Sequence, residues 1–180
     1  MAASQATFKR MNPKALRIGL VELYATGDGR LFSPRLKDLY SVVRLPSRAV
    51  DLLAAILRAQ GYSSVRVYNP LYNSYGGRFH EEELRELARM DVVGISSITR
   101  TQSQSYELAS RLKELNPMIR IIFGGPHVTA LPEDALEYGD VVVRHEGDAT
   151  IVELMERLGE SPADPSLSDI HNRFSCEIEA

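Results

Sequence analysis

The chain has 180 residues, a formal net charge of −3 and 25% charged residues. A chain of this size can bury a full hydrophobic core as one domain, and its slightly acidic balance gives no electrostatic reason to expect nucleic acid or an anionic membrane as a partner. One cysteine, Cys176, excludes an internal disulfide, fits a reducing, cytoplasmic compartment and cannot ligate an iron–sulfur cluster by itself.

Short apolar runs alternate with helical patterns along the chain, and each run ends in loop-forming residues. In chain order the pattern predicts a strand at 16–23, a helix at 47–59, a strand at 64–68, a helix at 81–90, a strand at 91–98, a helix at 102–115, a strand at 120–123, a helix at 132–138, a strand at 140–144 and a helix at 150–158. Runs such as Arg120–Phe123 are apolar without alternation, which is typical of parallel strands buried on both faces. The sequence therefore predicts a three-layer α/β fold with a five-stranded parallel, doubly wound, Rossmann-like or flavodoxin-like sheet.

The predicted domain covers residues 16–158, between two segments of different character. Residues 1–15 are polar and lack the apolar stretch of a signal peptide, so we expect a flexible arm there. Residues 159–180 are polar and irregular, which indicates a linker or tail. No apolar run reaches about 18 residues, so the sequence gives no reason to expect a membrane-spanning segment.

Ligands of a doubly wound sheet bind beyond the carboxyl ends of its strands, so the residues that follow each predicted strand are the most informative. Ser96 and Ser97 end an otherwise apolar strand, where a hydroxyl needs either a local backbone partner or a ligand. Gly124 and Gly125 follow the next strand directly. Two glycines there fit either a tight strand-to-helix turn or the close approach of a large group to bare backbone.

These motifs resemble those of a known family. Ser96 and Ile98 in the pattern Ser-x-Ile, followed after 25 residues by Gly124-Gly125, resemble the second and third signatures of cobalamin-binding domains. The stretches VVGISSIT, GGPHVTALPEDAL and VVVRHEGDATIVELMERL are similar to the amino-terminal domain of cobalamin-dependent radical SAM enzymes. The tail sequence SLSDI resembles the stretch that leads toward the radical SAM barrel in that family.

The resemblance implies that cobalamin binds with its dimethylbenzimidazole tail displaced from cobalt and inserted between the strands. Ser96 would contact the base, the two glycines would leave room for the nucleotide, and the segments after the fourth and fifth strands would border the ribose and phosphate. The loops after the first two strands would face the corrin. The candidate cofactor-binding residues are Tyr24, Ala25, Thr26, Tyr72, Ser96, Ser97, Thr99, Gly124, Gly125, Pro126, His127, Thr129, Glu146 and Gly147. No catalytic or metal-ligating residue is assigned.

One family signature is missing. Classical cobalamin carriers have DxHxxG after the first strand, and its histidine ligates cobalt, whereas this chain reads LYATGDG at that place. The resemblance is therefore to the radical SAM branch, and it implies a radical SAM domain as partner, in the same longer chain or in another, without catalysis by this chain alone. Two alternatives stay open: a flavodoxin-like FMN-binding flavoprotein, whose loop tyrosines stack on the flavin, and an interaction module without a ligand.

Overall fold

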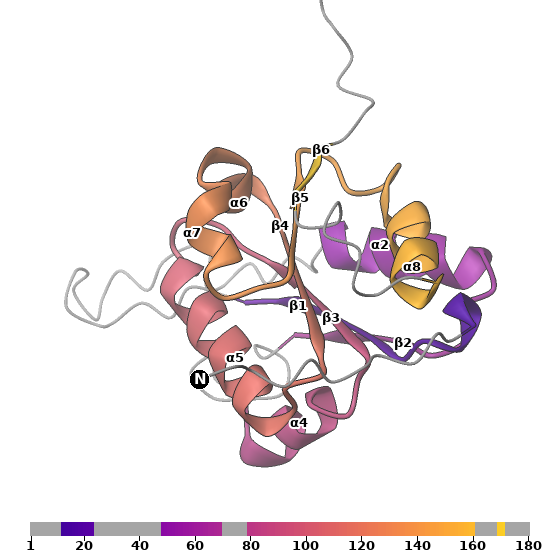
Figure 1. The fold of residues 1–180 in the computed structure, drawn as a ribbon, viewed down its shortest axis with the longest axis horizontal. Helices are drawn as coiled ribbons and strands as arrows, with labels where there is room; N and C mark the ends of the chain where they lie inside the picture. The colour runs from indigo at the N-terminus through magenta and orange to yellow at the C-terminus, as the bar shows by residue number, and fades with distance from the viewer. Residues whose placement is uncertain (1–11, 24–47, 70–78, 161–168, 172–180) are drawn as a thin grey trace, which may run out of the picture.

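A computed structural model describes residues 12–23, 48–69 and 79–160, together with the backbone of residues 169–171. Its centre is a parallel sheet in the order β2-β1-β3-β4-β5-β6 (Figure 1). The strands are β1 Ile18–Glu22, β2 Val65–Tyr68, β3 Val92–Ser96, β4 Arg120–Gly124, β5 Val141–Arg144 and β6 Asp169–His171. The helices are the 3-10 helix η1 Pro13–Ala15 and the α-helices α2 Arg48–Ala59, α4 Glu81–Leu87, α5 Gln102–Leu115, α6 Pro126–Ala130, α7 Pro132–Leu136 and α8 Ile151–Glu160.

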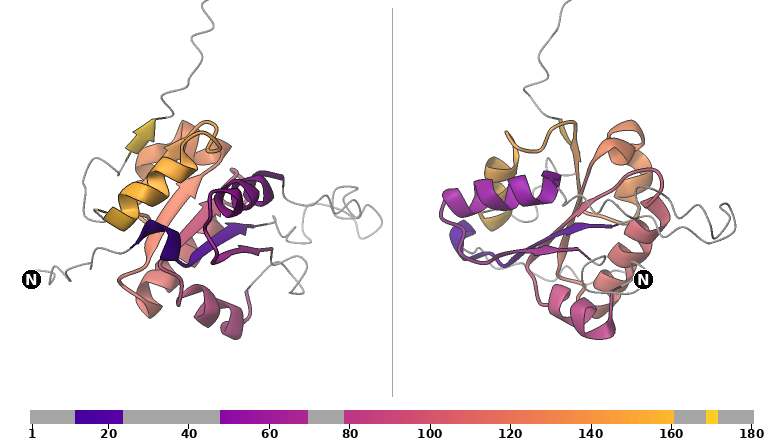
Figure 2. Two further views of the ribbon diagram at one scale, coloured as in Figure 1. Left: turned by 90° about the vertical axis from the view of Figure 1, so that its right-hand side faces the viewer. Right: turned by 180° about the vertical axis from the view of Figure 1, so that it is seen from behind.

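The helices form two layers, one on each face of the sheet (Figures 1 and 2). On one side, α2 and α8 bury apolar stripes that include Leu57 and Leu154 against Ile18 and Ile122. On the other side, α4, α5, α6 and α7 cover a second core around residues such as Phe123. Burial of the strands on both faces explains their unbroken apolar runs, and the predicted three-layer α/β fold is confirmed.

Successive residues of each strand point to opposite layers, and this alternation decides which side chains reach which helices. In β4, Ile121 and Phe123 belong to the core under α5, whereas Ile122 belongs to the core under α2 and α8. In β3, Val93 and Ile95 likewise face α5. The next residues of both strands, Ser96 and Gly124, therefore fall on the face covered by α2 and α8.

The strand order reverses at β1, because β2 lies on one side of it and β3 on the other. This is the switch point at which open α/β sheets leave a crevice beyond the carboxyl ends of the strands. Side chains at the opposite edge are engaged in structural contacts. Asp140 there accepts hydrogen bonds from Lys113 Nζ at 2.6 Å and from the backbone N–H of Ile121 at 2.8 Å, so this carboxylate links α5, β4 and the start of β5.

The structure differs from the sequence prediction at both ends of the domain and in one loop. Pro13–Ala15, assigned to the arm, forms η1, and Lys14 Nζ lies 4.1 Å from the Tyr62 ring centroid. Asp169–His171, assigned to the tail, pairs with β5 as a sixth parallel strand. The segment Pro126–Ala130, for which no helix was predicted, is the short helix α6, which begins with a proline at a position where no backbone donor is needed. Among the described helices, none is long and apolar enough to cross a bilayer.

Candidate functional site

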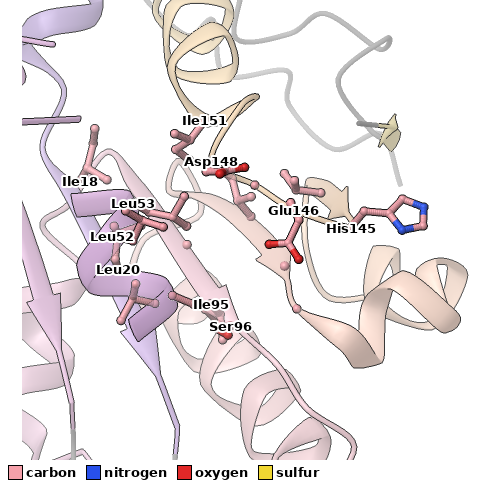
Figure 3. A pocket seen from close by; sticks show the side chains of 18 of the residues that line it. Ile18, Leu20, Leu52, Leu53, Ile95, Ser96, His145, Glu146, Asp148 and Ile151 are labelled. Atoms are coloured by element: carbon pink, nitrogen blue, oxygen red, sulfur yellow. The ribbon is translucent and has the colours of Figure 1, made fainter. Parts of the chain in front are cut away.

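A cavity of about 500 Å³ lies between the sheet and the helices α2 and α8, and the end of β3 together with residues that follow β4 and β5 surrounds it at the carboxyl edge (Figure 3). Its volume falls in the range of small-molecule and cofactor sites. The lining residues come from four strands, three helices and the segments after β4 and β5. They are Ile18, Leu20, Ala49, Val50, Leu52, Leu53, Val92, Gly94, Ile95, Ser96, Ile122, Gly124, Gly125, Pro126, Thr129, Val143, His145, Glu146, Gly147, Asp148, Ile151 and Met155.

The part of the cavity over the sheet face is apolar. Ile18 and Leu20 line it from β1, Ile122 from β4, and Met155 from α8. Gly94, in the middle of β3, keeps this region open, because a Cβ there would lie 2.9 Å from Leu20 Cδ2. Sequence reasoning missed Gly94. The available signal was a glycine inside a buried strand, which often marks close approach of a ligand or another backbone.

Three strand ends form a row beside the cavity. Glu22 of β1 pairs in register with Ser96 of β3, and Ser96 pairs with Gly124 of β4. Ser96 and Gly124 both line the cavity. A Cβ on Gly124 would have no atom closer than the carbonyl oxygen of Val143, at 3.9 Å. The wall at Gly124 is therefore bare backbone with room for a substituent or for a ligand.

The neighbouring glycine has a different structural role. Gly125 has φ +102° and ψ 174°, a conformation that is essentially restricted to glycine. A Cβ there would lie 2.6 Å from the carbonyl oxygen of Ser97. Two backbone hydrogen bonds join the segments at this contact between Ser97 and Gly125: Ser97 N donates to Gly124 O at 2.8 Å, and His127 N donates to Ser97 O at 3.2 Å. Gly125 thus allows β4 to turn into α6 against the end of β3.

The segment after β5 is fastened to α6 by Thr129. Its hydroxyl donates to the carbonyl oxygen of Gly125 at 3.0 Å and accepts a hydrogen bond from the backbone N–H of His145 at 3.0 Å. His145 has φ +63°, which is uncommon for a residue with a side chain. The His145 ring points away from the other labelled lining side chains, whereas Glu146 is directed toward the strand ends (Figure 3). Thr129 therefore positions Glu146 and Gly147 at the rim.

Glu22 brings a carboxyl group to this edge in an unusual environment. The side chain is half-buried, and its Oε2 atom has no hydrogen-bond partner within the part of the chain that the structure describes. Burial, and next the negative charge of Asp51 on α2, raise the pKa of Glu22. The end of β1 therefore favours the protonated form of this group more than water does.

The structure brings together seven of the predicted site residues as cavity lining: Ser96, Gly124, Gly125, Pro126, Thr129, Glu146 and Gly147. It places three others elsewhere. Ser97 is fully buried and His127 is 7% exposed, and both belong to the opposite face of the sheet, where the His127 ring centroid lies 6.2 Å from that of Tyr106. Thr99 is exposed in the turn after β3.

The remaining predicted residues, Tyr24, Ala25, Thr26 and Tyr72, lie outside the described residues. Sequence reasoning also missed the helical wall of the cavity, which Leu53 of α2 and Ile151 and Met155 of α8 provide. Their amphipathic spacing predicted burial, but nothing in it distinguishes a core contact from a cavity wall. Within the described ranges, no group of three or more histidine, cysteine, aspartate or glutamate residues could hold a metal ion.

Comparison with known proteins gives relatives of this domain. Over 71 residues the chain is 38% identical to an uncharacterized methyltransferase of Pyrococcus horikoshii, a match that covers 38% of this chain and 16% of that protein. Over 116 residues it is 29% identical to the anaerobic magnesium-protoporphyrin IX monomethyl ester cyclase of Rubrivivax gelatinosus, covering 61% of this chain and 20% of the relative. The chain thus spans a fifth or less of these curated relatives.

Among solved structures, the fold is similar to that of the radical S-adenosylmethionine methyltransferase TsrM from Kitasatospora setae. The TM-score is 0.57 at 16% identity, and the match covers 78% of this chain and 25% of that one. A likeness at this identity concerns the fold. The family model of the B12 binding domain matches residues 40–155, which include the row of strand ends at β3 and β4 and the rim after β5. This chain belongs to the family of B12-binding domains.

Proposed function

We propose that the cavity receives the base and nucleotide tail of cobalamin, with the base released from cobalt and the corrin held over the carboxyl edge of the sheet. The observation that carries the proposal is the pairing of Ser96 with Gly124 at the cavity wall. It joins a hydroxyl that can serve a heteroaromatic nitrogen to a stretch of bare backbone. Both residues lie at the edge of the apolar part of the cavity over the sheet face, which we call the apolar chamber.

The dimensions and chemistry of the chamber fit the base. A flat bicyclic ring needs apolar walls and close approach to the sheet, and Gly94 and Gly124 supply that approach because a side chain at either position would project into the space. For comparison, an apolar cavity of about 150 Å³ holds benzene in another protein. A volume of about 500 Å³ therefore leaves room for a benzimidazole and part of its ribose.

Residues at the rim suit the rest of the cofactor. Pro126, Thr129 and the Glu146–Gly147 backbone would border the ribose and phosphate. Leu52 is 52% exposed on the first turns of α2, and Ile98 is 44% exposed just after β3. Exposed apolar side chains at the carboxyl edge offer contact for the corrin. When bound, cobalamin would supply organometallic and radical chemistry that side chains lack, so the role of this chain is to hold, orient and shield it.

We further propose that no histidine of the DxHxxG type ligates cobalt. The segment LYATGDG after β1 contains no histidine. Of the histidines whose side chains the structure describes, His80 precedes α4 on the opposite layer, His127 packs near Tyr106, and the His145 ring points out of the cavity. The lower face of cobalt would then lack a ligand from the loop that provides one in classical carriers.

The proposed partner is a radical SAM domain, in the same longer chain or in a separate one. The comparisons support this, because one solved structure with a similar fold is a radical S-adenosylmethionine methyltransferase, and this chain covers only 25% of it. Cys176 alone cannot hold an iron–sulfur cluster, so the cluster and the substrate site would belong to that partner. By this proposal the isolated chain binds the cofactor without turning over a substrate.

The test is cofactor retention by the purified chain. The apoprotein is mixed with hydroxocobalamin or, separately, with FMN, desalted, and examined by visible absorption. We expect a retained corrin with a base-off spectrum. Retention of FMN alone would establish the flavoprotein alternative, and retention of neither would favour an interaction module without a ligand.

A pair of variants connects retention to the cavity. Gly124→Leu fills the chamber from a position whose backbone accepts a side chain, and it should abolish retention. Ala59→Leu adds the same side chain at an exposed position on α2 that does not line the cavity, and it should retain cobalamin as the native chain does. Equal retention by both variants would refute the placement of the tail.

A further inference from the structure

The apolar chamber described above holds few polar groups that a ligand can use. The side chains deep in it are those of Ile18, Val92, Ile122, Val143 and Met155. The backbone groups of β1, β3 and β4 beside them are engaged in the parallel ladder. Any ring that enters the chamber therefore meets hydrocarbon on most sides.

The polar atoms nearer the rim are largely engaged already. The Thr129 hydroxyl donates to Gly125 O and accepts from His145 N. The carbonyl oxygen of Gly124 accepts from Ser97 N. Ser96, which faces the cavity between the apolar chamber and the rim, supplies one hydroxyl. The carboxylates of Glu146 and Asp148 also line the cavity, but they follow β5 at the rim. A ring buried in the apolar chamber can therefore satisfy one acceptor nitrogen at Ser96, whereas the further polar groups of a larger heterocycle would lie against hydrocarbon.

We propose that this pocket selects among cobamides by the chemistry of their lower base, an inference that rests on the proposed function. Cobamides are natural relatives of cobalamin that carry a benzimidazole, a phenol or a purine at the end of the nucleotide loop. The structure assigns the chamber to benzimidazole and phenolic bases and against adenine. Adenine would bring an amine and further ring nitrogens into the chamber, and a buried polar group without a partner is strongly unfavourable.

The size of the effect follows from the number of groups left unpaired. One unsatisfied buried group lowers affinity by roughly 5- to 150-fold. We therefore expect an adeninyl cobamide to bind at least about 10-fold more weakly than a p-cresolyl cobamide. This pair is the informative comparison, because the phenol does not coordinate cobalt and adenine is a weaker base than dimethylbenzimidazole. Release of the base from cobalt then contributes little to the ratio.

Two sets of variants attribute the selectivity to this pocket. Ser96→Ala removes the hydroxyl and should weaken cobalamin about 2- to 12-fold, the range of one neutral hydrogen bond, while p-cresolyl cobamide, which has no ring nitrogen, is unaffected. Met155→Gln places an amide in the chamber at nearly constant volume and should narrow the gap between adeninyl and p-cresolyl cobamides. Met155→Leu is its apolar control and should leave the gap unchanged. For each cobamide we compare the affinity of the variant with that of the native chain. The free energy of releasing the base from cobalt belongs to the free cobamide, so it cancels in this ratio.

The experiment is equilibrium dialysis of the full 180-residue chain against cobalamin, p-cresolyl cobamide, adeninyl cobamide and cobinamide, read by corrin absorbance. The chain has no tryptophan, so absorbance of the ligand is the practical signal. Tight cobalamin and p-cresolyl binding with weak adeninyl binding supports the inference. Adeninyl cobamide within threefold of p-cresolyl cobamide overturns it and leaves cobalamin binding intact. Cobinamide, which has no base, binding as tightly as cobalamin also overturns it. Failure of every corrinoid to bind refutes the proposed function itself.

Discussion

Replacing Gly125 with alanine should destabilise the fold, whereas the same change at Gly124 should impair only the cavity. Gly125 has φ +102° and ψ 174°, and a Cβ there would lie 2.6 Å from Ser97 O. A side-chain residue held in such a conformation costs about 1–3 kcal/mol, and overpacking adds about 1–3 kcal/mol. The clash is with backbone, which cannot rotate away. We therefore expect Gly125→Ala to lower the free energy of unfolding by about 2–6 kcal/mol.

Gly124→Ala is the matched comparison. A Cβ at this position has open space, since its nearest neighbour is 3.9 Å away, and alanine in a strand loses less conformational entropy on folding than glycine by roughly 0.5–1 kcal/mol. The unfolding free energy should stay the same or rise by up to about that amount. The added methyl group would occupy ligand space, so cobalamin should bind more weakly by roughly 5- to 150-fold, the equivalent of about 1–3 kcal/mol of overpacking.

The assay is urea unfolding of the apoprotein followed by circular dichroism, with cobalamin affinity measured by dialysis on the same preparations. Stability and affinity should separate: Gly125→Ala moves the unfolding midpoint, and Gly124→Ala moves the dissociation constant. The reasoning is refuted if Gly125→Ala unfolds at the native urea concentration, or if Gly124→Ala destabilises the apoprotein as strongly as Gly125→Ala does.

Three further predictions concern single side chains. Glu22→Gln should raise the free energy of unfolding at pH 7. The raised pKa of Glu22 gives the native chain stability that is present below the ordinary value of 4.5 and is lost as pH rises through the folded pKa. Urea titrations from pH 4 to pH 8 should therefore show that the variant's excess in unfolding free energy disappears at the acid end. Asp91→Asn should lower the unfolding free energy by about 1–2 kcal/mol at pH 7. Burial disfavours the Asp91 carboxylate, but hydrogen bonds from the Arg17 side chain and backbone and the Arg17 charge outweigh this effect and lower the pKa of Asp91. The difference in unfolding free energy between variant and native chain should therefore disappear as pH falls below 3.8 and through the folded pKa. An unchanged difference at pH 3 would contradict a stabilising role of the Asp91 carboxylate. Ser97→Ala should leave the unfolding free energy unchanged or higher, since the buried Ser97 Oγ has no partner among the described residues, and it should bind cobalamin like the native chain, in contrast to Ser96→Ala.

Much of the fold could be predicted from the sequence, because apolar periodicity and turn residues report burial directly. The helix at 102–115 was predicted at its observed bounds, and the five predicted strands are all present. The short strand β6 was missed because three residues in a polar segment carry no periodic signal. The helix α6 was missed because Gly-Gly-Pro indicates a turn, and the helix that follows has only five residues.

The site was predictable to the level of the chain segment but not of the individual side chain. Ser96 and Ser97 look equivalent in the sequence, yet the pleat of β3 directs Ser96 to the cavity and buries Ser97 on the opposite face. His127 was likewise predicted as a site residue together with its neighbours Pro126 and Thr129, because the sequence does not show which of them face the cavity. The turn of α6 directs His127 away from it. The register of Ser96 with Gly124 depends on strand pairing, which one sequence does not reveal.

In each of the two adjacent pairs, Ser96-Ser97 and Gly124-Gly125, the two residues have different structural roles. The first member of each pair lines the cavity, and the second member forms the junction that holds the first in place, although Gly125 also borders the cavity. Ser97 N bonds to Gly124 O, and Ser97 O packs against the Cα of Gly125 at a distance that leaves no room for a Cβ. A motif that resembles a row of ligand contacts is therefore half scaffold. It follows that a related sequence that keeps Gly125 but replaces Gly124 should fold in the same way without binding the cofactor tail. One that replaces Gly125 should lose the junction, and with it the alignment of Ser96 and Gly124, even if both of these residues are kept.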